Sequence, residues 1–347
     1  MAAGSHALTT LASFDGANGQ VPIGGVVADA AGNLYGTASQ GGAFGDGTVY
    51  EIAAGTNTIT TLASFSDATG QRPQGSLILD AAGNLYGTAA YGGPDSLGTV
   101  FEIAAGTNTI TTIASFATSD TTGGLEPTGN LVVDAAGNLY GTTAYGGPNN
   151  GGTVFEIAAG TNTITTLASF DSTAGLTTGG LVLDAAGNLY GTTSNSSTVF
   201  KIAAGTHTLT TVASLGYSTG SGLEGNLIVD AAGNLYGTAI ETYGSPDSGT
   251  VYEVAAGTGV VTVLLSFTDE VGGTPQAGLL ADAAGNLYGT TSDGGANDSG
   301  SVFELSNTGF QLPVSTPPSV VLQARPPRRT PKQPRSAPSR PALAATP

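Results

Sequence analysis

The side chains with most chemical potential in this sequence are carboxylates, since the chain has no Cys and only two His, His6 and His207. Of its 25 acidic residues, eleven recur at two fixed positions of an internal repeat, beginning with Asp29 and Glu51. A carboxylate needed in every repeat is expected to be structural. The sequence contains no Gly-x-Ser-x-Gly elbow, His-Glu-x-x-His pair or phosphate-binding loop. We therefore predict no catalytic residue.

The remaining carboxylates fall in segments that differ between repeats. They could attract Ca²⁺, a hard cation that prefers oxygen ligands, but no twelve-residue Ca²⁺ loop is present. A solvated acidic surface is the expected structure there, so no cofactor is predicted. Residues 1–310 hold all 25 acidic residues and two basic ones, Arg72 and Lys201, which gives a net charge of −23. Such a body repels phosphate backbones, so nucleic acid is excluded as an expected partner.

Two groups of residues are candidates for ligand binding. Glu126, Asn130, Glu224 and Asn226 precede or begin the first strand of two repeats, where they would lie near the mouth of a central channel or simply finish a turn. Tyr91 and Tyr145 occupy matching Ala-Tyr-Gly-Gly-Pro loops, and Tyr243 lies in a related loop. An exposed aromatic ring can stack on a sugar or a protein partner, or pack over its own neighbouring repeat.

The residues that must position these side chains form the repeat itself. The nonapeptide that starts at Asp29 and reads Asp-Ala-Ala-Gly-Asn-Leu-Tyr-Gly-Thr returns at intervals of 46 to 54 residues, at Asp80, Asp134, Asp184, Asp230 and Asp282. Each repeat contains four short segments rich in Val, Ile, Leu, Thr and aromatics, at 25–28, 33–38, 48–53 and 58–65 in the first. Their apolar residues face both ways, which favours sheets packed on both sides. We predict an all-β, six-bladed β-propeller of four-stranded blades, with a β-helix as the alternative.

The two ends of the repeat region complement each other. Residues 2–14 align with the last segment of a repeat, 53–65, whereas the sixth repeat ends after its third segment at 300–305. We therefore expect the N-terminal strand to complete the last blade and close the ring, with three strands from one end and one from the other. The propeller is expected over 1–310 and a disordered Pro- and Arg-rich tail over 311–347.

An antiparallel order of strands sorts the loops onto two faces. The turns after the first and third strands, such as 29–33 and 53–57, are nearly the same in every repeat; we call their side of the disc the scaffold face. Asp29 is expected to accept backbone N–H bonds there and Gly32 to adopt positive φ. The other connections vary, among them 39–47, 90–98, 117–129 and 144–152; they form the variable face, where we expect binding.

The segment Gly-Gly-Leu-Val-Leu-Asp-Ala-Ala-Gly-Asn-Leu-Tyr-Gly-Thr at 179–192, followed by Thr-Val-Phe-Lys-Ile at 198–202, resembles the GloVer (Gloeo/Verruco) tandem repeat family. The resemblance covers residues 2–305 and implies a bacterial, propeller-like protein that is exported and held by one of several anchors. It therefore implies an extracellular or cell-surface location, although no signal peptide is visible in residues 1–10 and no apolar run approaches about 18 residues.

The Asp-x-x-Gly-Asn-Leu-Tyr turn is also weakly similar to NHL and gluconolactonase-like propellers. That similarity implies a metal held by acidic residues at the channel mouth, where this chain instead offers Gly25, Ser76, Asn130, Gly180, Asn226 and Gly278.

Three hypotheses on function follow. The first is a non-enzymatic, monomeric surface or secreted protein that binds a glycan or a protein through the variable face. The second is a lactonase- or lyase-like enzyme with a cation at the channel mouth. The third is a structural component of a surface layer or matrix.

Overall fold

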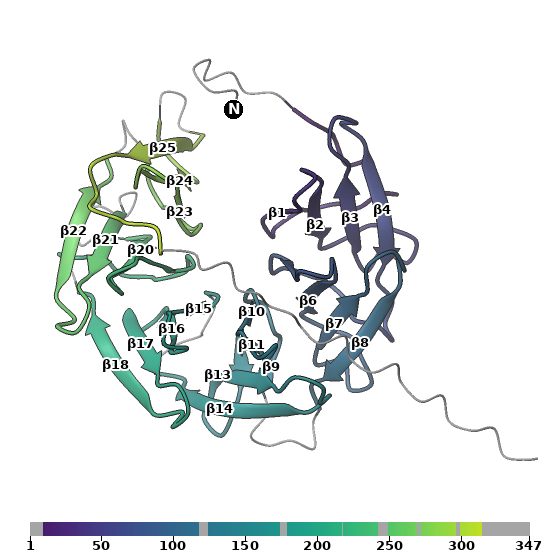
Figure 1. The fold of residues 1–347 in the computed structure, drawn as a ribbon, viewed down its shortest axis with the longest axis horizontal. Coiled ribbons are helices and arrows are strands. Elements are labelled where there is room, and N and C mark those ends of the chain that lie inside the picture. Colours follow the sequence, from purple (N-terminus) through teal and green to yellow (C-terminus); the bar gives the residue numbers. More distant parts are fainter. Residues whose placement is uncertain are drawn as a thin grey trace, which may run out of the picture.

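The computed structural model describes residues 10–117, 124–173, 179–216, 218–241, 249–268, 272–295 and 299–313. Six antiparallel sheets follow one another around a central axis, and strands are the only regular elements among these residues (Figure 1). The predicted six-bladed β-propeller is confirmed. Within the described ranges, no helix has the length and apolar character to cross a membrane.

Strands run outward from the axis in sequence order within each blade. Blade 1 holds β1 (Val27–Ala28), β2 (Leu34–Ala38), β3 (Thr48–Ile52) and β4 (Ile59–Ser64), and blade 2 holds β5 (Ile78–Leu79), β6 (Leu85–Ala89), β7 (Thr99–Ile103) and β8 (Ile110–Ser115). Blade 3 holds β10 (Val132–Val133), β11 (Leu139–Thr143), β13 (Asn150–Ile157) and β14 (Ile164–Asp171), and a separate small sheet pairs β9 (Gly124–Leu125) with β12 (Tyr145–Gly146).

The remaining blades repeat this order. Blade 4 holds β15 (Val182–Leu183), β16 (Leu189–Thr193), β17 (Thr198–Ile202) and β18 (Leu209–Ser214), and blade 5 holds β19 (Ile228–Val229), β20 (Leu235–Ala239), β21 (Thr250–Val254) and β22 (Val261–Ser266). Blade 6 holds β23 (Leu280–Ala281), β24 (Leu287–Thr291) and β25 (Ser301–Leu305).

The hydrophobic core lies between blades. One cluster joins Val49 and Phe65 of blade 1 to Leu77, Leu85 and Phe101 of blade 2. Phe65, just after the outer strand, meets Phe101 of the next blade edge-on, with ring centroids 4.9 Å apart. The edge-on contact recurs as Phe116–Phe155 and Phe267–Phe303, and Phe170–Phe200 makes the equivalent contact with the rings tilted at 49°. Apolar residues on both faces of each sheet are thus explained by a neighbour on each side.

The nonapeptide forms the predicted turn between the first two strands. Asp29 Oδ1 accepts hydrogen bonds from the backbone N–H groups of Ala31 and Asn33, both at 2.9 Å. Gly32 has φ +85°. Asn33 Oδ1 then accepts from the N–H of Ala54 at 2.9 Å, which ties this turn to the one between the third and fourth strands. The nonapeptide Asn accepts the equivalent backbone bond in blades 2 to 5.

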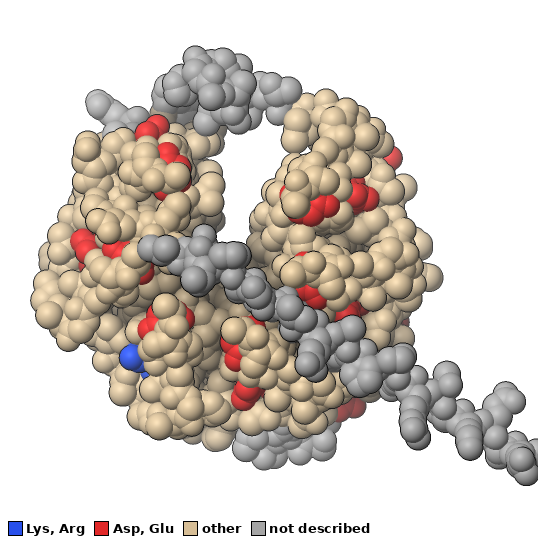
Figure 2. Space-filling model, viewed as in Figure 1, with Lys and Arg blue, Asp and Glu red and all other residues tan. Residues whose placement is uncertain are grey.

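The junction between blades 6 and 1 differs from the other five. Among the described residues blade 6 has three strands, and most of the segment predicted to complete it, 2–14, lies outside them. Phe14 does reach Tyr50 of blade 1, edge-on at 5.0 Å, which is the contact that the end of a preceding blade makes elsewhere. Val302 of blade 6 is nevertheless 67% exposed and Val26 of blade 1 is 52% exposed. A gap separates these two blades on the face seen in Figure 2.

Beyond β25 the chain returns to the scaffold face. Phe310 is buried against Tyr236 of blade 5, with ring centroids 5.1 Å apart. The N–H of Ala231 donates to Gln311 O at 2.9 Å, and Thr308 Oγ1 donates to Gly285 O at 2.8 Å. The predicted domain boundary at residue 310 falls within this docked segment, and residues 314–347 of the predicted tail lie outside the described ranges.

Candidate binding site on the variable face

The recurring carboxylates are engaged in holding the scaffold face together. Tyr35 OH lies 3.1 Å from Asp29 Oδ2 and 3.3 Å from Glu51 Oε1, so a single hydroxyl sits between two carboxylates. Burial, followed by the hydrogen bond to Asp29, raises the pKa of Tyr35 to about 12. Red patches of acidic side chains recur from blade to blade in Figure 2. In blade 4, Lys201 replaces the Glu, and its Nζ lies 5.6 Å from the ring centroid of Tyr190.

The two asparagines predicted at the channel mouth join neighbouring blades. Asn130 Oδ1 accepts from the N–H of Ser76 in blade 2 at 2.6 Å, and Asn226 Oδ1 accepts from the N–H of Gly180 in blade 4 at 2.5 Å. Ser76 Oγ accepts from the N–H of Gly25 in the same way, at 2.8 Å. These side-chain oxygens are therefore occupied in holding the first strands of adjacent blades together.

The four residues predicted near the channel do not form one group. Glu224 is exposed and belongs to blade 5, whereas Glu126 belongs to blade 3 and is half-buried. Glu126 lies four residues before Asn130, but Glu224 lies only two before Asn226, so the two carboxylates occupy different structural positions. Tyr243, the third aromatic candidate, lies outside the described residues.

Two of the predicted groups instead meet at the variable face between blades 2 and 3. Tyr91 OH of blade 2 donates a hydrogen bond to Glu126 Oε2 of blade 3 at 2.8 Å. Arg72 Cζ lies 5.5 Å from the ring centroid of Tyr91, within cation–π distance. The bond to Glu126, and then burial, raises the pKa of the Tyr91 hydroxyl. The guanidinium of Arg72, the ring of Tyr91 and the carboxylate of Glu126 thus lie in sequence across the boundary between blades 2 and 3.

Tyr145 extends this group. It is carried by β12, which pairs with β9 so that Tyr145 lies opposite Leu125, the residue before Glu126. Its side chain is 38% exposed. We refer to Arg72, Tyr91, Glu126 and Tyr145 as the blade 2–3 cluster. It offers an accessible ring face beside groups that donate and accept hydrogen bonds.

The backbone under this cluster is strained. Arg72 and Glu126 both have positive φ, 51° and 56°, although neither residue type favours that region. The N–H of Arg72 donates to Asp46 O of blade 1 at 2.9 Å, and that of Glu126 donates to Leu97 O of blade 2 at 3.2 Å. Such a conformation costs about 1–3 kcal/mol and persists where surrounding bonds impose it.

Sequence reasoning missed Arg72 and Phe44 as site residues. Phe44 is 67% exposed, and it lies in the blade 1 loop whose Asp46 O accepts from Arg72. Two features of the sequence could have indicated them. Phe44 is a lone aromatic residue among Gly, Ala and Asp, and Arg72 is the one basic residue in the variable segments of 1–310. No rule of spacing links either one to Tyr91.

Nothing in the described ranges brings three or more His, Asp or Glu side chains together as a metal site. The described residues therefore place no three carboxylates around a common point for the Ca²⁺ considered from sequence. Several of the acidic loop positions lie outside the description, among them Asp120, Asp247, Asp269, Glu270 and Asp298.

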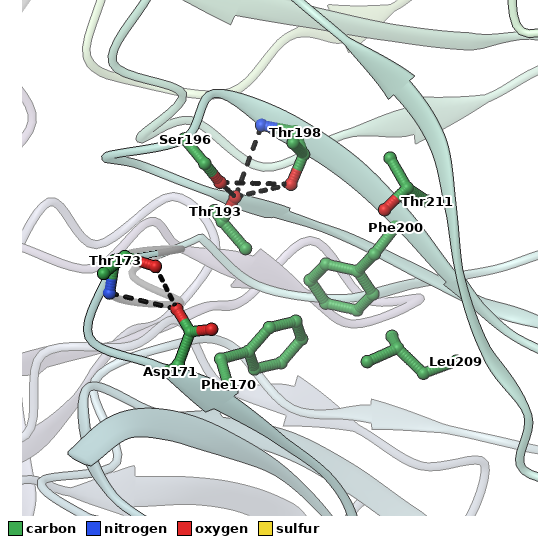
Figure 3. A pocket seen from close by; sticks show the side chains of 9 residues that line it. All are labelled: Phe170, Asp171, Thr173, Thr193, Ser196, Thr198, Phe200, Leu209 and Thr211. Atoms are coloured by element: carbon green, nitrogen blue, oxygen red, sulfur yellow. Dashed lines mark hydrogen bonds between the residues drawn. The ribbon is translucent and has the colours of Figure 1, made fainter. Parts of the chain in front are cut away.

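A cavity of about 300 Å³ lies between the end of β14 and the sheet of blade 4 (Figure 3). Its hydroxyl wall holds Thr193, whose Oγ1 is 2.6 Å from Thr198 Oγ1 and 2.8 Å from Ser196 Oγ. The opposite wall contains Phe170 and Phe200, with ring centroids 4.9 Å apart. Both rings are buried, with 7% and 2% of their side chains exposed.

Comparison with known protein families identifies the repeat. The model of the Gloeobacter/Verrucomicrobia repeat matches residues 1–197 and 194–316. The chain belongs to this family. The resemblance read from the sequence is thereby confirmed. No curated protein matches the chain.

Solved structures similar to this Gloeobacter/Verrucomicrobia repeat protein include two lyases and a lactonase. Virginiamycin B lyase from Staphylococcus aureus has a TM-score of 0.57 at 14% identity, covering 82% of this chain and 84% of that one. A streptogramin B lyase gives 0.55 at 13% identity, with 86% and 85% covered. A gluconolactonase from Xanthomonas campestris gives 0.51 at 15% identity, with 78% and 83% covered. At these identities the likeness shows the fold alone.

Proposed function

We propose that this repeat-family propeller is a non-enzymatic secreted or cell-surface protein that binds a glycan or a protein through its variable face. The observation that carries the proposal is the hydrogen bond from Tyr91 OH to Glu126 Oε2, with Arg72 over the Tyr91 ring. It holds three side chains of different chemistry in a fixed arrangement across two blades. A group held rigidly before binding loses less conformational freedom when a ligand arrives.

The difference between the two faces supports binding on the variable face. Scaffold-face carboxylates are bonded within their own turns, as Asp29 is to Ala31, Asn33 and Tyr35. Variable-face loops differ in length and composition, and the four residues of the blade 2–3 cluster come from four of them. Loops that diversify on a rigid frame are the usual place for recognition.

The alternatives drawn from sequence receive less support from the described residues. A lactonase- or lyase-like enzyme would need polar groups at the channel mouth that are available to a cation or substrate. Asn130 Oδ1 and Asn226 Oδ1 accept backbone bonds from adjacent blades instead. A purely structural matrix role would not require the cross-blade arrangement of Arg72, Tyr91 and Glu126.

The test is binding of the full chain to a printed glycan array and, in parallel, to a panel of purified surface proteins. We expect the double variant Tyr91→Ala/Tyr145→Ala to lose at least about tenfold in affinity for whatever the wild type binds. Val260→Ala is the matched control, because Val260 is an exposed apolar residue (59%) that follows a scaffold-face turn. Equal binding by the double variant and the wild type would contradict the proposal.

A further inference from the structure

Four blades place a residue of positive φ at the same point of the variable face. Val21, Arg72, Glu126 and Thr274 have φ between 50° and 56°, and each directly precedes a proline. Their carbonyls accept the same bond from the loop after the second strand, from the N–H groups of Ser39, Ala90, Ala144 and Ser292. The backbone at this point is therefore a repeated element, whereas the side chains are unrelated.

Neither the proline nor the residue types explain this conformation. A residue before proline is normally extended. Positive φ is uncommon for any residue with a side chain and is a marked outlier for β-branched Val21 and Thr274. Glycine would provide the same backbone without strain. Blade 5 shows this directly, because Gly222 has φ 67° there and accepts the equivalent bond from Ile240.

The scaffold face shows which residue types occupy positive φ where only the backbone conformation is needed. Its turns after the third strand also need positive φ, and they use Asn57, Asn108, His207, Gly259 and Asn307. Gly, Asn and His are the types that tolerate this region best. On the variable face the chain keeps Val, Arg, Glu and Thr instead, so there the side chain itself is what the position requires.

Packing does not account for these side chains. Val21 is 46% exposed, Arg72 is exposed, and Glu126 and Thr274 are partly exposed. Blade 5 has an evident reason for its glycine, because a Cβ at Gly222 would lie 2.5 Å from Ile240 Cγ1. The equivalent positions of blades 1, 2, 3 and 6 carry side chains that are at least partly exposed, and Arg72 and Glu126 also contact Tyr91.

A second residue accompanies each position. The residue before the strained one lies opposite a loop residue of the same blade, in the pairs Gln20–Gln40, Gln71–Tyr91, Leu125–Tyr145, Ser221–Glu241 and Gly273–Asp293. In blades 1, 2, 3 and 6 a strained residue thus follows a pair whose loop member is polar or aromatic. Tyr91 also reaches Glu126 of the next blade, so the pairs of blades 2 and 3 are joined.

We propose that Val21, Arg72, Glu126 and Thr274 are the specificity-determining residues of the variable face, and that they contact one extended saccharide that crosses several blades. The proposal rests on the function proposed above and narrows it to one ligand class. The side chains opposite the residues before these positions are polar or aromatic (Gln40, Tyr91, Tyr145, Asp293), which suits the hydroxyl groups and ring faces of sugars. The core of a protein interface is depleted of charged residues, whereas this set includes Glu126 and Asp293.

The test uses the full-length chain and oligosaccharide series of increasing length: neutral glucans, chitin oligomers and uronate polymers. We expect affinity to increase with oligosaccharide length. The triple variant Arg72→Gly/Glu126→Gly/Thr274→Gly should bind at least about tenfold more weakly, because it removes hydrogen-bonding side chains. Its melting temperature should fall little, since the relief of positive φ by glycine offsets the loss of the bond between Tyr91 and Glu126.

Asn57→Gly/Asn108→Gly is the matched control, because it changes positive-φ residues of the scaffold face and should bind as the wild type does. Glu126→Gln, which keeps the shape of the side chain, gives a second measurement should the triple variant fold poorly. If the triple variant bound the saccharide as tightly as the wild type, this inference would be wrong. If Tyr91→Ala/Tyr145→Ala still weakened binding in that case, the proposed function would stand without the inference. A wild type that binds a surface protein but none of the saccharides would overturn the ligand class alone.

Discussion

Tyr91 of blade 2 and Glu126 of blade 3 are joined by a 2.8 Å hydrogen bond across a blade boundary, on the face where the repeats differ. Because Glu126 also adopts positive φ, the bond fixes a side chain whose backbone is already held by Leu97 and Ala144. The two residues form one unit, although 35 positions separate them in the chain.

Removing this hydrogen bond should have a measurable and specific cost. We expect Tyr91→Phe to lower the free energy of unfolding by about 0.5–1.5 kcal/mol, and Glu126→Ala, which removes the acceptor, by a similar amount. The double variant should cost less than the sum of the two, because each single change already breaks the same bond. Urea unfolding of the four proteins gives this coupling. Strictly additive losses would mean that the two side chains do not interact in solution.

The nonapeptide Asp should be far more important for stability than an exposed carboxylate. Asp134 accepts four hydrogen bonds, from the N–H groups of Ala136 and Asn138, from Asn138 Nδ2 and from Tyr140 OH. We expect Asp134→Ala to cost at least about 2 kcal/mol, because several half-buried donors lose their acceptor. Glu224→Ala, at an exposed carboxylate, is the control and should change stability by less than about 0.5 kcal/mol. Similar melting temperatures for both variants would contradict this role.

The N-terminal segment should contribute strongly to thermal stability. Phe14 packs on Tyr50, so deletion of residues 1–14 removes a blade-to-blade contact as well as the strand expected to complete blade 6. We expect a sharply lower melting temperature by calorimetry, and a smaller decrease for Phe14→Ala alone. Phe44→Ala is the control, since Phe44 is 67% exposed. An unchanged melting curve for the deletion would be incompatible with ring closure by this segment.

Stability should decline in alkaline solution because of the buried tyrosines of the scaffold face. Burial and bonds to carboxylates raise the pKa of Tyr35 and Tyr190 from 10.0 to about 12 in the folded protein. A raised folded-state pKa means that the folded chain retains protons that the unfolded chain releases. The stabilisation is complete below pH 10 and is lost as the pH rises towards about 12.

Urea unfolding at a series of pH values across this window measures the effect, with Tyr35→Phe as the comparison. That variant should show a shallower decline with pH than the wild type, since one of the shifted groups is gone. A decline of equal slope in both proteins would show that Tyr35 ionises alike in the folded and unfolded chains.

The fold was predictable because its signals are local and repeated. Asp29 to Thr37 contains the turn chemistry, and the recurrence of that segment gives the number of blades. The two faces followed from antiparallel order alone. The blade 2–3 cluster could be predicted only in part, because Tyr91 and Glu126 come from loops of different blades. Their proximity depends on how blade 2 sits against blade 3, which the repeat pattern does not specify.

The sequence also grouped Glu126 with Glu224, two residues that the structure separates. Both are acids shortly before an Asn at the start of a blade, so the sequence suggested one site. The loops before the two blades are built differently, and only Glu126 occupies the strained position before a proline. The positive φ of Arg72 was also unpredictable, because neither Arg nor the following Pro73 favours it.

The exposed junction between blades 6 and 1 has a consequence for how the ring comes apart. In an array where each unit contacts only its neighbours, opening begins at the weakest joint and spreads inward from the two ends. Val302 and Val26 mark that joint, so amides of blades 1 and 6 should exchange with solvent before those of the middle blades. Tyr91 and Glu126 lie on blades 2 and 3, so the hydrogen bond between them should remain intact during the first step of unfolding.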